Sequence, residues 1–180
     1  MDLRVKKTTK SIKEAFFELR KKKNLEKISV KELSEMAMIN KATFYLHYRD
    51  IFDLSDRLEN ELIDNIISEV KNINPINSKA NFKLFFQTLS MVILNRSYEI
   101  RVLFSGQENN HFVDNLEESL KAYLFSNYPS LRNNIDNNLL LTFTIQGSYR
   151  TFVRNSTIKS ETLVEKTSEM TLGLFESYSF

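Results

Sequence analysis

The segment from Ser29 to Tyr48 reads SVKELSEMAMINKATFYLHY, and the interpretation of the whole chain starts from it. Ser29 is followed three residues later by Glu32, a capping-box spacing that predicts the start of a helix. After a short apolar break, Asn40 offers the N-cap of a second helix. The segment therefore predicts two short helices joined by a tight turn.

The apolar and polar side chains of this segment separate onto different sides. One face of the first helix holds Val30, Leu33, Met36 and Ala37. The second helix, from Lys41 to about Leu46, is expected to bury Phe44, and Tyr48 just after it is also expected in the core. Its other side chains, Lys41, Thr43, Tyr45 and His47, then point away from the core. Two helices joined by a turn of three or four residues, the second one short and polar-faced, are typical of a DNA-binding helix-turn-helix.

This segment resembles the DNA-binding unit of the tetracycline-repressor (TetR) family of bacterial transcriptional regulators. The matching residues are Ser29, Val30, Leu33, Ala37, Ile39, the run Asn40-Lys41-Ala42-Thr43, the run Phe44-Tyr45-Leu46-His47-Tyr48, and Phe52, Asp53 and Leu54. The specific part of the resemblance covers roughly residues 8 to 58, about a third of the chain. The remainder agrees only in length and helical character.

Two positions depart from the family pattern. The family usually has glycine in the turn, where this chain has Met38. If Met38 adopts a left-handed conformation, its side chain costs about 1 kcal/mol or more. The family often has a phosphate-binding lysine at the start of the fourth helix, where this chain has Ile51, and Arg49 can supply that charge.

The resemblance implies a ligand-responsive transcriptional regulator, a repressor that binds a palindromic operator as a homodimer. Tyr45 can hydrogen-bond a phosphate, and Thr43 can contact a phosphate or a thymine methyl group. The amides that open the Ser29 helix form another phosphate site. The full set of expected DNA-binding residues is Ser29, Lys31, Lys41, Ala42, Thr43, Tyr45, His47 and Arg49.

Composition limits the other possibilities. The 180 residues include no cysteine, only three glycines and two prolines, which excludes thiolate chemistry and favours helices throughout. No apolar run approaches the roughly 20 residues that span a bilayer, and the N-terminus does not read as a signal peptide. A cytoplasmic protein is therefore expected. Residues 1–50 carry a net charge of +6 and the rest −4, which suits a DNA-facing head, although a solvated lysine-rich helix face has the same composition.

The expected fold is all-α, with about nine helices in two domains. Residues 1–49 form a three-helix DNA-binding domain, in which residues 1–7 are an arm. Its first helix runs from Thr8 or Thr9 to about Lys23, with the apolar stripe Ile12, Ala15, Phe16 and Leu19. Residues 50–180 form a helical ligand-binding and dimerisation domain. It begins with a long helix after Asp50, where Asp50 and Asp53 have the spacing of a capping box and Asp50 is the expected cap. The apolar stripe of this helix is Ile51, Leu54, Leu58, Leu62 and Ile66.

Five more helices are expected after it. The second of these ends at Gly106, and the third is capped by Asn110 and stops before Pro129.

The last two helices carry apolar residues around much of their surface. The first of them ends at Arg154, and the second begins at Ser160. The resemblance implies that they form the homodimer interface, where Gly147 and Gly173 would allow close approach. Packing within one chain is the alternative, and it stays open at this stage.

The sequence does not favour an enzyme, a metal site or a cofactor. Its glycines stand alone, and its two histidines lack metal-site spacing. The pair Glu117-Glu118 is expected on a solvated face. An apolar or aromatic effector could bind among Phe86, Phe104, Phe143, Gln146, Tyr149 and Arg150, although an aromatic stripe can also be plain core. A second possibility is a TetR-like module that acts through protein–protein contacts with no small-molecule inducer.

Overall fold

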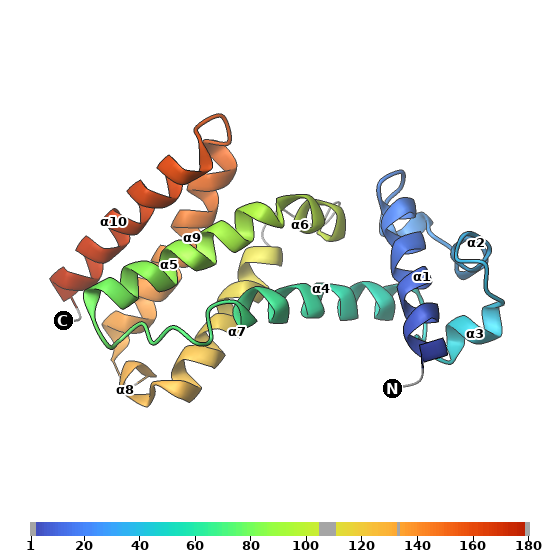
Figure 1. Cartoon of the computed structure of the whole chain (residues 1–180), viewed down its shortest axis with the longest axis horizontal. Helices are drawn as coiled ribbons and strands as arrows, with labels where there is room; N and C mark the ends of the chain where they lie inside the picture. The colour runs from blue at the N-terminus through green and yellow to red at the C-terminus, as the bar shows by residue number, and fades with distance from the viewer. Residues whose placement is uncertain (1–2, 105–110, 133, 179–180) are drawn as a thin grey trace. The chain divides into compact units, whose positions relative to one another are not determined.

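The computed structural model describes residues 3–104, 111–132 and 134–178, and within these ranges the chain is helical, with no strand (Figure 1). The helices are α1 Leu3–Arg20, η1 (a 3-10 helix) Leu25–Lys27, α2 Val30–Met36, α3 Lys41–Tyr45, α4 Ile51–Ser68, α5 Lys79–Asn95, α6 Ser97–Leu103, α7 His111–Asn127, α8 Pro129–Arg132, α9 Ile135–Arg154 and α10 Ser160–Tyr178. The predicted all-α fold is confirmed. The predicted stop at Gly106 and the predicted cap Asn110 lie outside the described residues.

The described ranges hold ten α-helices rather than about nine, because Pro129 opens a separate short helix, α8. Proline suits the first position of a helix, where its missing N–H would have no intrahelical partner. A proline that was expected only to stop α7 therefore also starts the next element.

Helix α1 begins earlier than predicted. Residues 3–7 were expected to be an arm, but the helix already starts at Leu3 and ends at Arg20. The Thr9 hydroxyl donates to the Val5 carbonyl, four residues back, so Thr9 lies inside the helix and does not cap it. The predicted stripe of Ile12, Phe16 and its neighbours is buried, as expected.

By its contacts the chain divides into two compact units. In the described residues, the first unit comprises residues 3–61 and 98–104, and the second comprises 62–97, 111–132 and 134–178. The first unit thus contains α6 except for its first residue, Ser97, as well as α1 to α3 and the first part of α4. The second contains the rest of α4, α5 and α7 to α10.

The core of the first unit is built from one face of α1 and the inner faces of α2 and α3. Phe16, Leu33 and Phe44 are completely inaccessible to solvent. Met36 was predicted to share this core, but 41% of its surface is exposed. Because α2 has only two turns, its buried side is made by Leu33, Ser34 and Ala37 at i, i+1 and i+4, and Met36 falls outside it.

Arg20, the last residue of α1, is buried and links two segments of the first unit. Its guanidinium donates to the carbonyl oxygens of Lys23 and Leu103, each at 3.2 Å. Leu103 is the last residue of α6, so this side chain ties the end of α6 to the end of α1. Burial lowers the pKa of the guanidinium, whereas Glu26 and Glu59 act to raise it.

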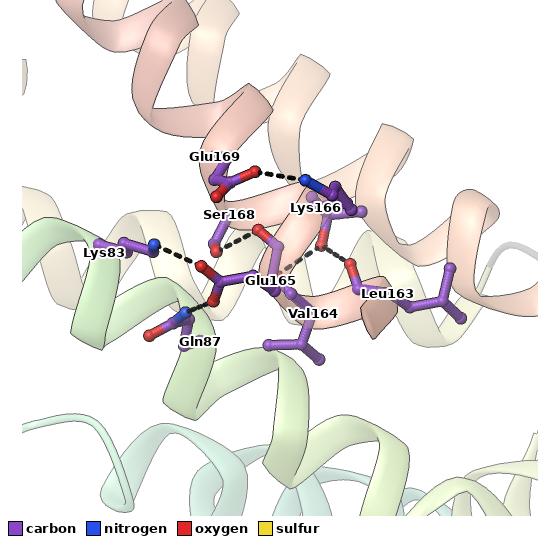
Figure 2. Close-up of polar contacts among 9 residues, drawn as sticks. Lys83, Gln87, Leu163, Val164, Glu165, Lys166, Ser168 and Glu169 are labelled. Atoms are coloured by element: carbon purple, nitrogen blue, oxygen red, sulfur yellow. Dashed lines mark hydrogen bonds and ion pairs between the residues drawn. The ribbon is translucent and has the colours of Figure 1, made fainter. Parts of the chain in front are cut away.

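In the second unit α10 packs along α5, the most extensive helix pairing in this unit. Figure 2 shows the polar contact between them: the Glu165 carboxylate of α10 accepts from Lys83 at 2.7 Å and from Gln87 at 2.6 Å, both on α5. Alongside it, Phe82 of α5 packs on Phe175 of α10 with ring centroids 4.6 Å apart. One side of α10 is therefore occupied within this chain.

Glu117 of α7 is not the solvated residue that was expected. Its side chain is only 15% exposed and pairs with Lys121 at 2.7 Å. It also accepts hydrogen bonds from Thr142 and Gln146 of α9, because α7 and α9 pack side by side. Burial is the largest single influence on the pKa of this carboxyl group and raises it, but Lys121, Thr142 and Gln146 together lower the pKa below its ordinary value.

Candidate nucleic-acid interface

The two short helices of the first unit are each opened by the predicted cap. The Ser29 hydroxyl accepts from the amide of Glu32 at 3.2 Å, and α2 follows. The Asn40 side-chain oxygen accepts from both the amide and the hydroxyl of Thr43, at 2.7 and 2.8 Å, and α3 follows. Both predicted N-caps are confirmed.

The turn between these helices forces Met38 into the left-handed region, with φ 54°. The Met38 amide donates to the Glu35 carbonyl and the Ile39 amide donates to the Ser34 carbonyl. This pair of bonds is a Schellman motif, which ends a helix with a left-handed residue that is usually glycine. Met38 is the one non-glycine residue with positive φ in the described chain, and its side chain is 91% exposed.

Helix α3 has a buried side and an open side. Phe44 and Tyr48 are buried, with ring centroids 5.7 Å apart, as predicted. On the open side Lys41 and Ala42 are exposed, and 56% of Tyr45 is accessible. The remaining two predicted contacts of this segment, Thr43 and His47, are half-buried. The Tyr45 ring packs edge-on against Phe44, with ring centroids 5.6 Å apart.

Lys31 and Arg49, the expected DNA contacts before and after α3, differ in how closely they approach a neighbouring carboxylate. Lys31 of α2 is exposed and lies 4.0 Å from Glu35, a weak surface pair. Arg49 is also exposed, but its guanidinium lies 3.2 Å from the Asp53 carboxylate. Ile51, one of the two departures from the pattern of the family that the sequence resembles, is 4% exposed and belongs to the core. A charge at residue 51 would therefore be buried in this protein.

Asp53 organises the start of α4. Its own amide donates to Asp50, the predicted cap, at 2.8 Å. Its carboxylate accepts from the Arg49 amide at 3.0 Å and from the guanidinium groups of Arg49 and Arg57. The Arg49 amide holds the pKa of this carboxyl below its ordinary value, burial opposes that shift, and the two guanidinium groups reinforce it.

Leu46 is a residue of this surface that was not assigned a role from the sequence. It follows α3 directly, and 83% of its surface is exposed. An exposed leucine beside Tyr45 could contact a thymine methyl group or a sugar. The sequence already indicated that Leu46 is exposed, because Phe44 and Tyr48 account for the buried side of this turn.

The residues expected to bind an effector lie in different surroundings. Phe143 was expected in the interior but is 65% exposed on α9, and Phe104 is buried in the first unit, whereas Phe86 is buried in the second. Gln146 donates instead to Asp114 and Glu117 of α7. Tyr149 packs on Phe112, and both it and Phe86 line a cavity of about 20 Å³, which Arg150 does not line.

A second cavity in this unit, of about 40 Å³, is lined by residues of α5, α7, α8, α9 and α10 and of the α4–α5 connection. Cavities that hold drug-sized ligands are about 300–1,000 Å³. In this conformation both cavities are therefore too small for such a ligand, because the phenylalanine and leucine side chains fill most of the interior.

Comparison with known proteins gives no family assignment. A search against protein-family models found no match, and a search of curated protein sequences found none either. Within the described ranges, no helix has both the length and the apolar character to cross a bilayer. The same ranges contain no cluster of three or more His, Asp or Glu side chains that could hold a metal ion.

Proposed function

We propose that this protein is a DNA-binding transcriptional regulator of the tetracycline-repressor type, a ligand-responsive cytoplasmic repressor that binds its operator as a homodimer. One observation carries the proposal. The open side of α3 presents Lys41, Ala42 and Tyr45 directly after a capped turn, while Phe44 holds the helix in the core. A short helix with a buried anchor and an exposed polar side is suited to the major groove.

The surface of α9 supports the dimer. Three large apolar side chains at i, i+4 and i+8, those of Ile135, Leu139 and Phe143, are 74%, 61% and 65% exposed. They form one apolar stripe, and Gly147 continues it one turn further on. On α10, Met170 is 67% exposed and Gly173 lies one turn away. A Cβ atom at either glycine would meet nothing within 4 Å in this chain, so a second copy could approach closely there.

A ligand can release the regulator from DNA only by binding the DNA-incompetent state more tightly. A molecule with equal affinity for both states would shift nothing, however tightly it bound. The test for a regulatory ligand is therefore a change in operator affinity, and binding to the protein alone does not suffice.

The experiment is operator selection from random DNA, followed by affinity measurements across a salt series. Specific binding should weaken linearly with the logarithm of salt concentration. Tyr45→Ala should reduce affinity for the selected operator roughly tenfold. Tyr98→Ala is the matched control, because Tyr98 is a 46% exposed tyrosine on α6 of the same unit. Failure to select any sequence, or equal binding by the two variants, would contradict the proposal and favour a module that acts through protein contacts.

A further inference from the structure

The cavity of about 40 Å³ in the second unit contains two polar side chains in an otherwise apolar lining. Asn137 and Thr144 of α9 are 6% and 4% exposed. Neither the Asn137 side-chain oxygen nor the Thr144 hydroxyl has a hydrogen-bond partner. The rest of the lining is aliphatic and aromatic, including Phe82, Phe86 and Phe175, and contains no charged residue.

Buried polar atoms without partners are rare in folded proteins, because each one loses its hydrogen bonds to water and gains nothing in return. The helix provides no partner here, since Asn137 and Thr144 point to the cavity side of α9, seven residues and about two turns apart. The Asn137 oxygen can only accept, so it requires a donor. The absence of charged lining residues disfavours an ionic ligand, because nothing would offset its desolvation.

We propose that this cavity binds a small uncharged molecule with an apolar body and a hydroxyl group, which donates to Asn137. The phenylalanine side chains would surround the body, and the Thr144 hydroxyl is available to a second polar atom. The regulatory role of such a ligand rests on the proposed function, whereas its binding does not. Binding is measured on the protein without DNA, so a failure here is distinct from a failure to bind an operator.

Cavity size restricts the ligand further. A water molecule needs about 10–15 Å³ by this measure, and an engineered apolar cavity of roughly 150 Å³ admits benzene. The present cavity therefore accepts a few non-hydrogen atoms as it stands, and a single ring only after Ile76 or Leu131 moves. Ile76 lines the cavity from the α4–α5 connection and Leu131 from α8, and neither is fully buried.

The experiment compares phenol with anisole, its methyl ether, by methyl NMR titration of the whole chain. The two have similar bodies, but only phenol can donate. Saturable shifts are expected at Leu141 and Ile145, which line the cavity, while Leu33 of the first unit is the internal control. Phenol should bind roughly 5- to 150-fold more tightly, since anisole leaves the Asn137 oxygen unpaired.

The variant Asn137→Leu has nearly the same shape and should remove the preference for phenol. Without ligand it should also raise Tm by about 2–8 °C, because it eliminates an unpaired buried group. Thr144→Val should likewise raise Tm, and it tests the second polar group. Equal binding of phenol and anisole to the unaltered protein would overturn the proposal, as would absence of saturable shifts with both. An unchanged preference in Asn137→Leu would do the same.

Discussion

The α2–α3 segment and helix α9 owe their conformations to different interactions. In α2–α3, local hydrogen bonds fix the backbone: Ser29 and Asn40 cap the helices, and the amides beside Met38 close the turn. Helix α9 is a regular twenty-residue helix whose buried side is chosen by α7, α8 and α10. Where local bonds set the backbone, the exposed side chains other than that of Met36 follow from the sequence. Where packing sets it, they do not.

Removing the anchor of α3 tests whether its caps are sufficient without packing. Phe44→Ala should reduce the free energy of unfolding by about 3–5 kcal/mol, because Phe44 is fully buried and the short helix cannot close the cavity. Urea unfolding followed by circular dichroism measures the loss. Phe52→Ala is the control, since Phe52 is 52% exposed in the same unit, and it should cost much less. A loss below about 1 kcal/mol for Phe44→Ala would mean that the caps hold α3 without its anchor.

Charging the exposed stripe of α9 tests whether that side is covered by a second copy. Phe143→Asp should weaken the proposed homodimer by roughly 30-fold or more, the effect of losing an aromatic hot spot, and sedimentation equilibrium measures the change. Leu84→Asp places the same charge on α5, at a residue that is 50% exposed. If both variants remained equally dimeric, the stripe would not be the interface.

Replacing the left-handed residue Met38 tests how much strain the turn of the α2–α3 segment contains. Met38→Gly should stabilise the protein by about 0.5–1 kcal/mol, because glycine adopts positive φ without steric cost. Met36→Gly, two residues earlier in right-handed helix, should destabilise it by a similar amount. Thermal unfolding of the pair gives the result. Equal effects of the two substitutions would show that the turn is not under strain.

The smallest effect concerns pH. The pKa of Asp53 is lowered in the folded protein, so its contribution to stability is complete above the unfolded value of about 3.9 and is lost as pH falls through the lower folded pKa. Asp53→Asn should therefore lower stability at neutral pH and flatten its decline below about pH 4. Urea unfolding between pH 7 and pH 2.5 measures this. Asp56→Asn, at an exposed carboxylate of the same helix, is the control, and an identical acid profile would contradict the assignment.

The sequence predicted the capped parts of the fold well. Ser29, Asn40 and Asp50 were each identified as caps from residue type and spacing, and each accepts the expected backbone amide. The apolar periodicity of α1 and α4 also identified their buried sides, because each has only one apolar stripe. These features depend on interactions within a few residues, which a single sequence contains.

The same reasoning did not identify the buried side of helix α9, because this helix has two apolar sides. Leu141 and Ile145 are buried, whereas Leu139 and Phe143, which precede them by two residues respectively, are exposed. Periodicity cannot rank two such stripes, so Phe143 was assigned to the interior. The solvent exposure of Glu117 was also predicted wrongly. Its partners Thr142 and Gln146 are on another helix, and nothing near Glu117 in the chain indicates them.

The position of Arg20 restricts how the first unit can move. Its guanidinium is bonded to the last carbonyl of α6 and to the chain just after α1, in a place shielded from water. Sliding α6 past α1 would separate a buried charge from its acceptor, which is far costlier than displacing the two helices together. A displacement of α6 is therefore expected to move α1 with it, because the Arg20 hydrogen bonds hold the two helices together.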